Sequence, residues 1–304
     1  MTQPPRLFDR DLHRQRLARA AATYDKADFL KARAAEDLAS RLAAINRRFP
    51  VAVDLGARTG LFARVLAASE AADKVDLLVQ TDLSDVLLAR ADGTRVVTDE
   101  ARLPFAEASL DLVVSSLALH WIDDLVGTLI QIRRALKPDG LFLGAVIGGA
   151  SLTELRQCLM EAEIELAGGA GPRVSPLLDA YDGAALMQRA GFALPVVDVD
   201  RLTVGYDHLL PLTADLRAMG ETNVLVERPR SPLGRAVIAR ASELYLERFG
   251  TGDGRISATF EIITLTGWAP HPDQQKPLAP GSAKTRLADA LGVRERSAGE
   301  AAKP

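Results

Sequence analysis

The feature that most constrains the fold is an alternation of short apolar runs with helical patterns between residues 51 and 147. The apolar runs cover 51–55, 75–80, 95–98, 110–115 and 141–147. The helical patterns between them cover 61–68, 84–90 and 125–136. Strands that alternate with helices predict a parallel sheet covered on both faces. Right-handed crossovers then give a doubly wound α/β sheet, which binds ligands at the carboxyl ends of its strands.

The rest of the chain adds helices around this sheet and two further strands. Helical patterns are predicted at 7–45, 152–166, 183–189 and over most of 206–250. Strands are predicted at 196–204 and 260–268, which brings the mostly parallel, Rossmann-like sheet to seven strands. We therefore divide the chain into a helical N-terminal lid, 1–46, and an α/β domain, 47–270, with a helical insertion at about 206–255. An extended tail, 271–304, follows, and its last ten or so residues are expected to be disordered because they are rich in Pro, Gly, Ala and charge.

Charge and hydropathy exclude some classes of partner. The net charge is -3 and the pI about 5.9, which argues against bulk nucleic-acid binding. No apolar run reaches the roughly 20 residues that a membrane-spanning helix needs. Residues 6–19 carry five arginines and predict a basic amphipathic helix. This helix would contact a partner or a membrane surface, or would simply be a solvated helix face.

The loop from Asp54 to Gly60 joins the first strand to a helix. Gly56 and Gly60 would let the backbone approach a nucleotide closely, and Asp54 would face the amino end of a cationic ligand. A tight strand-to-helix turn without a ligand also explains the loop. Asp82 ends the second strand, 26 positions after Gly56. An acid at that place accepts hydrogen bonds from ribose hydroxyls, although a helix N-cap formed by Asp82 or Ser84 is the alternative.

Two later segments complete the predicted nucleotide site. Asp99 and Glu100, followed by Ala101, come after the third strand, where an acid can accept from an adenine amino group; an ordinary capped turn is the alternative. The fourth strand leads through Ser116 and Leu117 to His120, beside the ligand. His120 would act as a base or orient a substrate, or would be a structural residue at a helix start.

Metal chemistry has little support in the sequence. A non-haem iron site needs two histidines and a carboxylate. The chain has four histidines and one cysteine, and their spacing forms no convincing triad. No metal site is predicted.

The four segments together resemble the S-adenosylmethionine-dependent class I methyltransferases. The stretch 111–121 (DLVVSSLALHW), the stretch 136–140 (LKPDG) and residues 21–25 (AATYD) look like the malonyl-ACP O-methyltransferase group. The mitochondrial complex I assembly factor 5 family is more similar still. The residues that carry this second resemblance cover nearly the whole chain: 7–10, 148–149, 152–156, 174–176, 219–223, 267–268, His271 and 281–283.

The resemblance implies S-adenosylmethionine as the cofactor. Its binding residues would be Asp54, Gly56, Gly60, Asp82, Leu83, Asp99, Glu100 and Ala101, with Ser116 and Leu117 lining the far wall. The family's loop usually has a second glycine where this chain has Arg58. Arginine adds a Cβ and a cation near the sulfonium, which argues against tight binding of the cofactor. Because the similarity begins at Leu7, we expect no transit peptide and a bacterial, cytoplasmic protein, with peripheral contact at the inner membrane as a further option.

Three functions are compatible with these residues. The first is methyl transfer, to a protein or to a malonyl-ACP-type substrate, with Tyr24 and His120 orienting the substrate. The second, implied by the assembly-factor family, is hydroxylation of an arginine in a complex I subunit. The third is a non-catalytic assembly chaperone, for which Arg58 is the main support. We favour an enzyme that acts on a protein substrate during complex I assembly.

Overall fold

The computed structural model describes residues 6–274, 282 and 284–294, and the chain's contacts divide it into two units, 1–270 and 271–304. The second unit contains one described helix, α10 (Leu287–Leu291). The expected disorder of 295–304, and Gly281 and Ala283 of the resemblance, lie outside the described residues. A lid at 1–46, separate from the rest of the first unit, stays a prediction.

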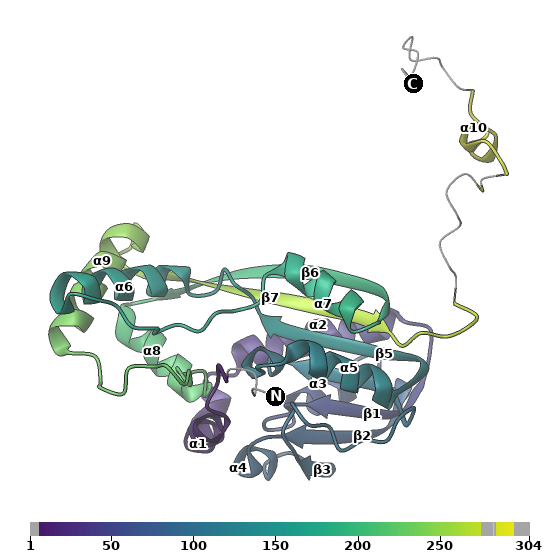
Figure 1. Ribbon diagram of the computed structural model, residues 1–304, viewed down its shortest axis with the longest axis horizontal. Coiled ribbons are helices and arrows are strands. Elements are labelled where there is room, and N and C mark those ends of the chain that lie inside the picture. The colour runs from purple at the N-terminus through teal and green to yellow at the C-terminus, as the bar shows by residue number, and fades with distance from the viewer. Residues whose placement is uncertain (1–5, 275–281, 283, 295–304) are drawn as a thin grey trace, which may run out of the picture. The chain divides into compact units, whose positions relative to one another are not determined.

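The first unit is built on a seven-stranded sheet of order β3-β2-β1-β4-β5-β7-β6 (Figure 1). Its strands are β1 (Phe49–Leu55), β2 (Val75–Asp82), β3 (Thr94–Val97), β4 (Leu110–Ser116), β5 (Leu136–Ile147), β6 (Ala193–Tyr206) and β7 (Ile256–Trp268). The pairs from β3 to β5 are parallel, and β7 runs antiparallel to both β5 and β6. The predicted doubly wound, mostly parallel seven-stranded sheet is confirmed.

Alternate residues of the central strands supply two separate cores. Ala52, Leu112 and Leu143 pack into the core shared with α2 (Phe29–Ala44) and α3 (Leu61–Ala67). Val53 and Val113 point to the other face and pack with α5 (Leu125–Ala135) and α7 (Ala180–Arg189). A strand places successive side chains on opposite faces, so a strand that is apolar at every position must be covered on both sides. The strand order reverses between β1 and β4, which places the switch point of the fold at the carboxyl ends of these two strands.

Several predicted boundaries differ from the observed ones. Residues 7–45 form two helices, α1 (Arg10–Ala20) and α2, separated by a 3-10 turn, η1 (Tyr24–Lys26). The region 206–250 contains α8 (Leu209–Ala218) and α9 (Arg235–Phe249), and the sixteen residues between them are not helical. Pro229 and Pro232, which lack a backbone N–H, fall in that interval and disfavour a continuous helix. β5 begins at Leu136, so residues 137–140 belong to the strand.

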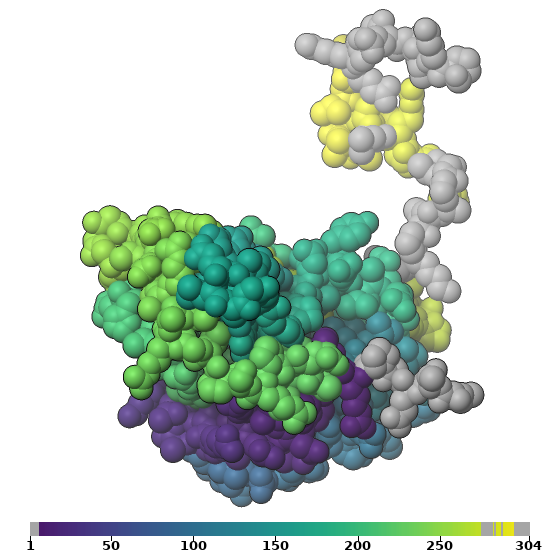
Figure 2. All heavy atoms as spheres, turned by 60° about the vertical axis from the view of Figure 1, so that its left-hand side comes forward, coloured from purple at the N-terminus to yellow at the C-terminus, as the bar shows by residue number. Residues whose placement is uncertain are grey.

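The N-terminal segment is fixed to the loop that follows α8. Phe8 forms an antiparallel bridge with Leu225, and the N–H of Asp9 donates to the carbonyl of Val224 at 2.8 Å. Figure 2 shows the purple N-terminal helices beneath this green segment. Both cover the carboxyl ends of β1, β2 and β4, where the site described below lies. α6 (Thr153–Ala167) and η3 (Leu119–Trp121) complete this end of the unit. Within the described part of the chain, no helix is both long enough and apolar enough to cross a membrane.

Candidate functional site

Three adjacent strands bring the predicted polar residues to one edge of the sheet. Asp54, Asp82 and Ser116 lie at the carboxyl ends of β1, β2 and β4, and all three side chains are buried. Parallel neighbours end at the same edge, so residues far apart in sequence meet there. Leu117 follows with a left-handed backbone, φ 51°, and is also buried.

The two glycines of the loop have different surroundings. Both have a left-handed backbone, φ 77° at Gly56 and φ 74° at Gly60. A Cβ on Gly56 would lie 2.2 Å from the Cβ of Ala118, which shows how closely the loop approaches the segment after β4. A Cβ on Gly60 would instead meet Gln80 and Ala91. Close packing within the protein therefore explains Gly60 without a ligand.

Asp82, the predicted ribose acceptor, is bound to Arg58. One carboxylate oxygen of Asp82 accepts from the Arg58 backbone N–H at 2.8 Å and from the Arg58 guanidinium Nη1 at 2.9 Å. The other accepts from the N–H of Ser84 at 2.8 Å. The Arg58 side chain is only 1% exposed and Glu100 lies 3.9 Å away. Burial alone would lower the pKa of Arg58, but Asp82 raises it above its usual value, so the pair is ionic. Ser84 is the N-cap of α4 (Asp85–Leu88), as the alternative interpretation proposed.

Asp99 and Glu100 are joined by Arg10, a contact that the sequence analysis missed. The Arg10 Nη2 atom donates to Asp99 Oδ1 at 2.6 Å and to a carboxylate oxygen of Glu100. The N–H of Ala101 donates to Asp99 at 3.0 Å, so the predicted capped turn is present too. Arg10 lies on α1, 89 positions before Asp99, and no local pattern links the two.

Lys31 is a second cation that the sequence analysis missed. Its ammonium donates to the carbonyls of Gly56 at 2.7 Å and Ser116 at 2.6 Å, and to the Ser116 hydroxyl at 2.9 Å. Lys31 thereby joins the loop to β4, and burial lowers its pKa to about 8. The one available signal was its position on the apolar face of α2, beside Leu30 and Ala34.

Asp54 has the most unusual surroundings of these acids. It is fully buried, and neither carboxylate oxygen has a hydrogen-bond partner among the residues that the structure describes. Burial raises its pKa to about 6, although the charge of Lys31 acts in the opposite direction. One nitrogen of Arg58, Nη2, is likewise buried without a partner. Buried polar atoms are nearly always hydrogen-bonded. A ligand that carries both an ammonium and a carboxylate, such as the amino-acid end of S-adenosylmethionine, fits this pair of groups.

The two predicted catalytic residues occupy different environments. Tyr24 is buried with Leu83 in an apolar cluster, and burial raises the pKa of its hydroxyl far above the usual value. His120 lines a cavity described below, and its Nε2 atom lies 3.0 Å from Glu221 Oε2. Trp121 Nε1 donates to the same oxygen at 2.7 Å. Burial would raise the pKa of Glu221, but His120 and Arg58 lower it below its usual value, so this residue is a carboxylate.

We expect Asp54→Asn to change how stability depends on pH. The unfolded Asp54 ionises near 3.8 and the folded one near 6, so the folded state holds the proton more tightly between these values. The stability that Asp54 contributes is therefore complete below pH 4 and lost as the pH rises through 6. Relative to the wild type, Asp54→Asn should be more stable at pH 7 than at pH 4 by about 2–3 kcal/mol. Urea unfolding at both pH values measures this difference.

Asp73→Asn, at an exposed position, is the matched control and should show no such difference. The pH does not exceed 7, so that Lys31, with its pKa of about 8, stays mostly protonated in the experiment. Equal effects of Asp54→Asn at the two pH values would contradict the burial of an ionisable Asp54.

Most of the predicted residues thus lie together at the carboxyl ends of β1, β2 and β4. Leu83 and Tyr24 pack against each other in an apolar cluster, and Gly60 packs against Gln80 and Ala91. No group of three or more His, Cys, Asp or Glu side chains that could hold a metal ion occurs among the residues that the structure describes.

Comparisons with known proteins agree with this geometry. A family model for the methyltransferase domain matches residues 53–144, which include the end of β1 and all of β2 and β4. The YcgJ protein from Bacillus subtilis has the same fold, with a TM-score of 0.52 at 16% identity over 77% of this chain and 98% of that chain.

Three curated proteins are similar over most of their length. The arginine-hydroxylase NDUFAF5 of Danio rerio is 39% identical, and the match covers 93% of this chain and 89% of the fish protein. NDUFAF5 of Homo sapiens is 39% identical, with 91% and 81% covered. The malonyl-[acyl-carrier protein] O-methyltransferase of Laribacter hongkongensis is 33% identical, with 86% and 90% covered.

Proposed function

The chain belongs to the NDUFAF5 family of methyltransferase-fold enzymes, and from this premise we propose that it binds S-adenosylmethionine and modifies an arginine of a respiratory complex I subunit. One observation of the structure carries the proposal. A fully buried carboxylate without a partner, Asp54, lies at the switch point of the sheet, where this fold binds its ligands. A cationic ligand at that point would supply the partner that Asp54 lacks.

The residues of the site would divide the cofactor between them. Asp54 would bind the ammonium of its amino-acid end, and Asp82 would bind the ribose. Asp99 and Glu100 would lie toward the adenine, held in place by Arg10. When bound, the cofactor supplies a methyl group that its sulfonium already activates. Hydroxylation of the arginine would instead use dioxygen as the oxidant and two electrons from an external reductant, with the second oxygen atom released as water. Asp82 could accept hydrogen bonds from the ribose hydroxyls only in competition with the Arg58 guanidinium.

The chain's own residues would position the substrate and exclude water. Lys31 closes the site between the loop and β4, and α1 covers its outer side. We keep His120 as the residue that contacts substrate, since it follows β4 at the edge of the nucleotide site and Glu221 fixes its ring. Tyr24, beneath Leu83, stays a prediction as an orienting residue. A cytoplasmic location with peripheral membrane contact also stays a prediction.

The proposal is tested by the masses of complex I subunits from cells with and without this protein. We expect one arginine-containing peptide to carry the mass of one extra oxygen atom in the wild type and to lose it in the deletion strain. Re-expression of the wild-type chain should restore the increment. This result would identify hydroxylation, the activity for which the relatives are named.

Two other outcomes would revise the proposal. An increment of one CH2 group in place of oxygen would identify methyl transfer to the same substrate. No difference between the strains would contradict both enzymatic functions for complex I. It would support a non-catalytic assembly role, which the Arg58–Asp82 pair also favours because it engages the predicted ribose acceptor.

A further inference from the structure

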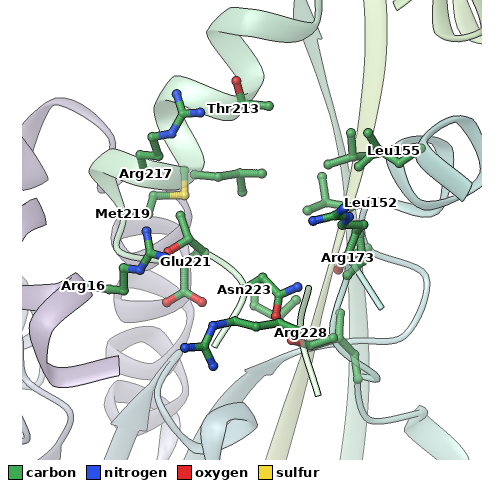
Figure 3. A pocket seen from close by; sticks show the side chains of 18 of the residues that line it. Arg16, Leu152, Leu155, Arg173, Thr213, Arg217, Met219, Glu221, Asn223 and Arg228 are labelled. Atoms are coloured by element: carbon green, nitrogen blue, oxygen red, sulfur yellow. The ribbon is translucent and has the colours of Figure 1, made fainter. Parts of the chain in front are cut away.

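A cavity of about 660 Å³ lies between α1, α6, α8 and the loop after α8 (Figure 3). Its volume is in the range of roughly 300–1,000 Å³ that is typical of small-molecule sites. His120 and Trp121 form its boundary toward the nucleotide site. The predicted cofactor residues do not line it, so this cavity is a separate compartment.

One wall of the cavity is apolar. Leu152, Leu155 and Leu159 line it from the start of α6, and Phe260 of β7 lies beside them. In Figure 3, Leu152 and Leu155 lie on the opposite side of the space from Arg16, Arg217 and Glu221. The occupant of this half of the cavity would be excluded from water, which favours an apolar chain.

Arginines line both sides of the cavity: Arg16 and Arg217 lie opposite the leucines, and Arg173 lies beside Leu152 (Figure 3). Five of the lining residues are arginines and one, Glu221, is a carboxylate. Arg173 pairs with Glu163, and Arg228 approaches Asp9 at 3.5 Å. The remaining three, Arg16, Arg217 and Arg230, form no ion pair with any residue that the structure describes.

Arg16 shows that these cations act on one another. Burial first, and then the charges of Arg19, Arg228 and Arg217, lower its pKa from the usual value. Its Nε atom is buried and has no hydrogen-bond partner. Two further residues of the lining, Ser175 and Thr222, also have buried hydroxyl oxygens without a partner among the described residues. The lining therefore presents arginines without a partner carboxylate, the half-buried Arg16 and the exposed Arg217 and Arg230, together with unused polar atoms.

Glu221 is the one carboxylate against five arginines in the lining, and its Oε2 atom already accepts from His120 and Trp121. It also lies close enough to Arg58 for their charges to interact. The excess of arginines over carboxylates in the lining consequently favours the binding of an anion from outside the protein. Guanidinium groups bind carboxylates and phosphates with two parallel hydrogen bonds.

We propose that this cavity binds an anionic amphiphile, a molecule with an apolar chain and a carboxylate or phosphate head group. The chain would lie along Leu152, Leu155 and Phe260, and the head group would bind Arg16 and Arg217. Carboxylate and phosphate head groups share this chemistry, since each offers the paired oxygens that a guanidinium binds.

The arginines of the lining argue against an arginine side chain as the occupant. A guanidinium brought beside Arg16 and Arg217 would meet like charges, with Glu221 as the one opposing carboxylate of the lining. The inference therefore does not rest on the proposed function, and its test needs neither S-adenosylmethionine nor a protein substrate.

Isothermal titration calorimetry of the full chain tests the proposal with two probes, decyl phosphate and decanoate, below their micelle concentrations. We expect both to bind and decanol to bind at least about tenfold more weakly, because it lacks the charge. Butyl phosphate and inorganic phosphate should also bind at least about tenfold more weakly, because they lack the chain.

The double variant Arg16→Gln/Arg217→Gln should lose about tenfold or more in affinity for decyl phosphate. Arg134→Gln/Arg189→Gln makes the same charge change at two exposed positions outside the cavity and should bind like the wild type. Thermal unfolding of each variant shows that it is folded.

Several results would overturn the proposal. They are no binding of either probe, decanol binding as tightly as decanoate, or equal losses in the two double variants. If inorganic phosphate bound as tightly as decyl phosphate, the site would be one for simple anions and the apolar part of the proposal would be wrong.

Discussion

Replacing Asp82 with alanine is expected to lower the free energy of unfolding by about 3–5 kcal/mol. The reason is the burial of its partner: the Arg58 side chain is 1% exposed and its nearest other carboxylate, on Glu100, lies 3.9 Å away. Removal of one member of a buried ion pair leaves the other charge without compensation in a poorly polarisable environment. Chemical denaturation at neutral pH measures the effect.

Asp76→Ala provides the matched control, because it also removes one carboxylate from an arginine. The Arg48–Asp76 pair is exposed, at 63% and 54%, so its loss should cost about 0–1 kcal/mol. A similar, small loss in the two variants would show that Arg58 does not depend on Asp82 in the folded protein. A cost for Asp82→Ala near the upper end would confirm that the pair is part of the core.

Arg58→Gly should be less damaging than Asp82→Ala, although both break the same pair. The Asp82 carboxylate keeps two backbone donors, the N–H groups of residue 58 and Ser84. Residue 58 also has a left-handed backbone, φ 54°, which glycine adopts without strain. This asymmetry makes Arg58 the residue to replace when the site itself is to be tested.

The predicted and the missed parts of the site differ in how their residues come together. Asp54, Asp82 and Ser116 were predicted because each ends a strand, and parallel strands end at one edge. The sequence alone carries that information in its apolar runs. The doubly wound arrangement of the sheet was predicted from the same runs, since right-handed crossovers leave few arrangements.

Arg10, Lys31 and Glu221 were missed because they come from elements that pack over this edge. Arg10 reaches Asp99 across 89 positions, and Glu221 reaches His120 across 101. The positions of these side chains depend on how α1 and the loop after α8 pack against the sheet. Helical periodicity predicts a helix but not where it packs. The sequence analysis singled out Arg58 as the departure from the family pattern, but the contact that makes it important is tertiary.

Arg58→Gly is expected to raise the affinity for S-adenosylmethionine by about tenfold to a hundredfold. Arg58 and the ribose hydroxyls would compete for the same carboxylate, because the guanidinium holds an Asp82 oxygen at 2.9 Å. A hydrogen bond to a charged group is worth about 1.5–3 kcal/mol, and breaking one to admit the ligand subtracts that amount from binding. Glycine leaves Asp82 free to accept from the ribose and removes a side chain from the pocket. Calorimetric titration of both proteins measures the change.

Arg58→Lys is the control, because lysine keeps a cation near Asp82 and should bind the cofactor about as weakly as the wild type. The opposite result is equally informative. If Arg58→Gly bound more weakly than the wild type while remaining folded, Arg58 would be a ligand of the amino-acid end, as its unpartnered Nη2 atom allows. If neither protein bound at millimolar ligand, the fold would serve assembly without this cofactor. The buried Arg58–Asp82 pair would then be the structural substitute for the nucleotide.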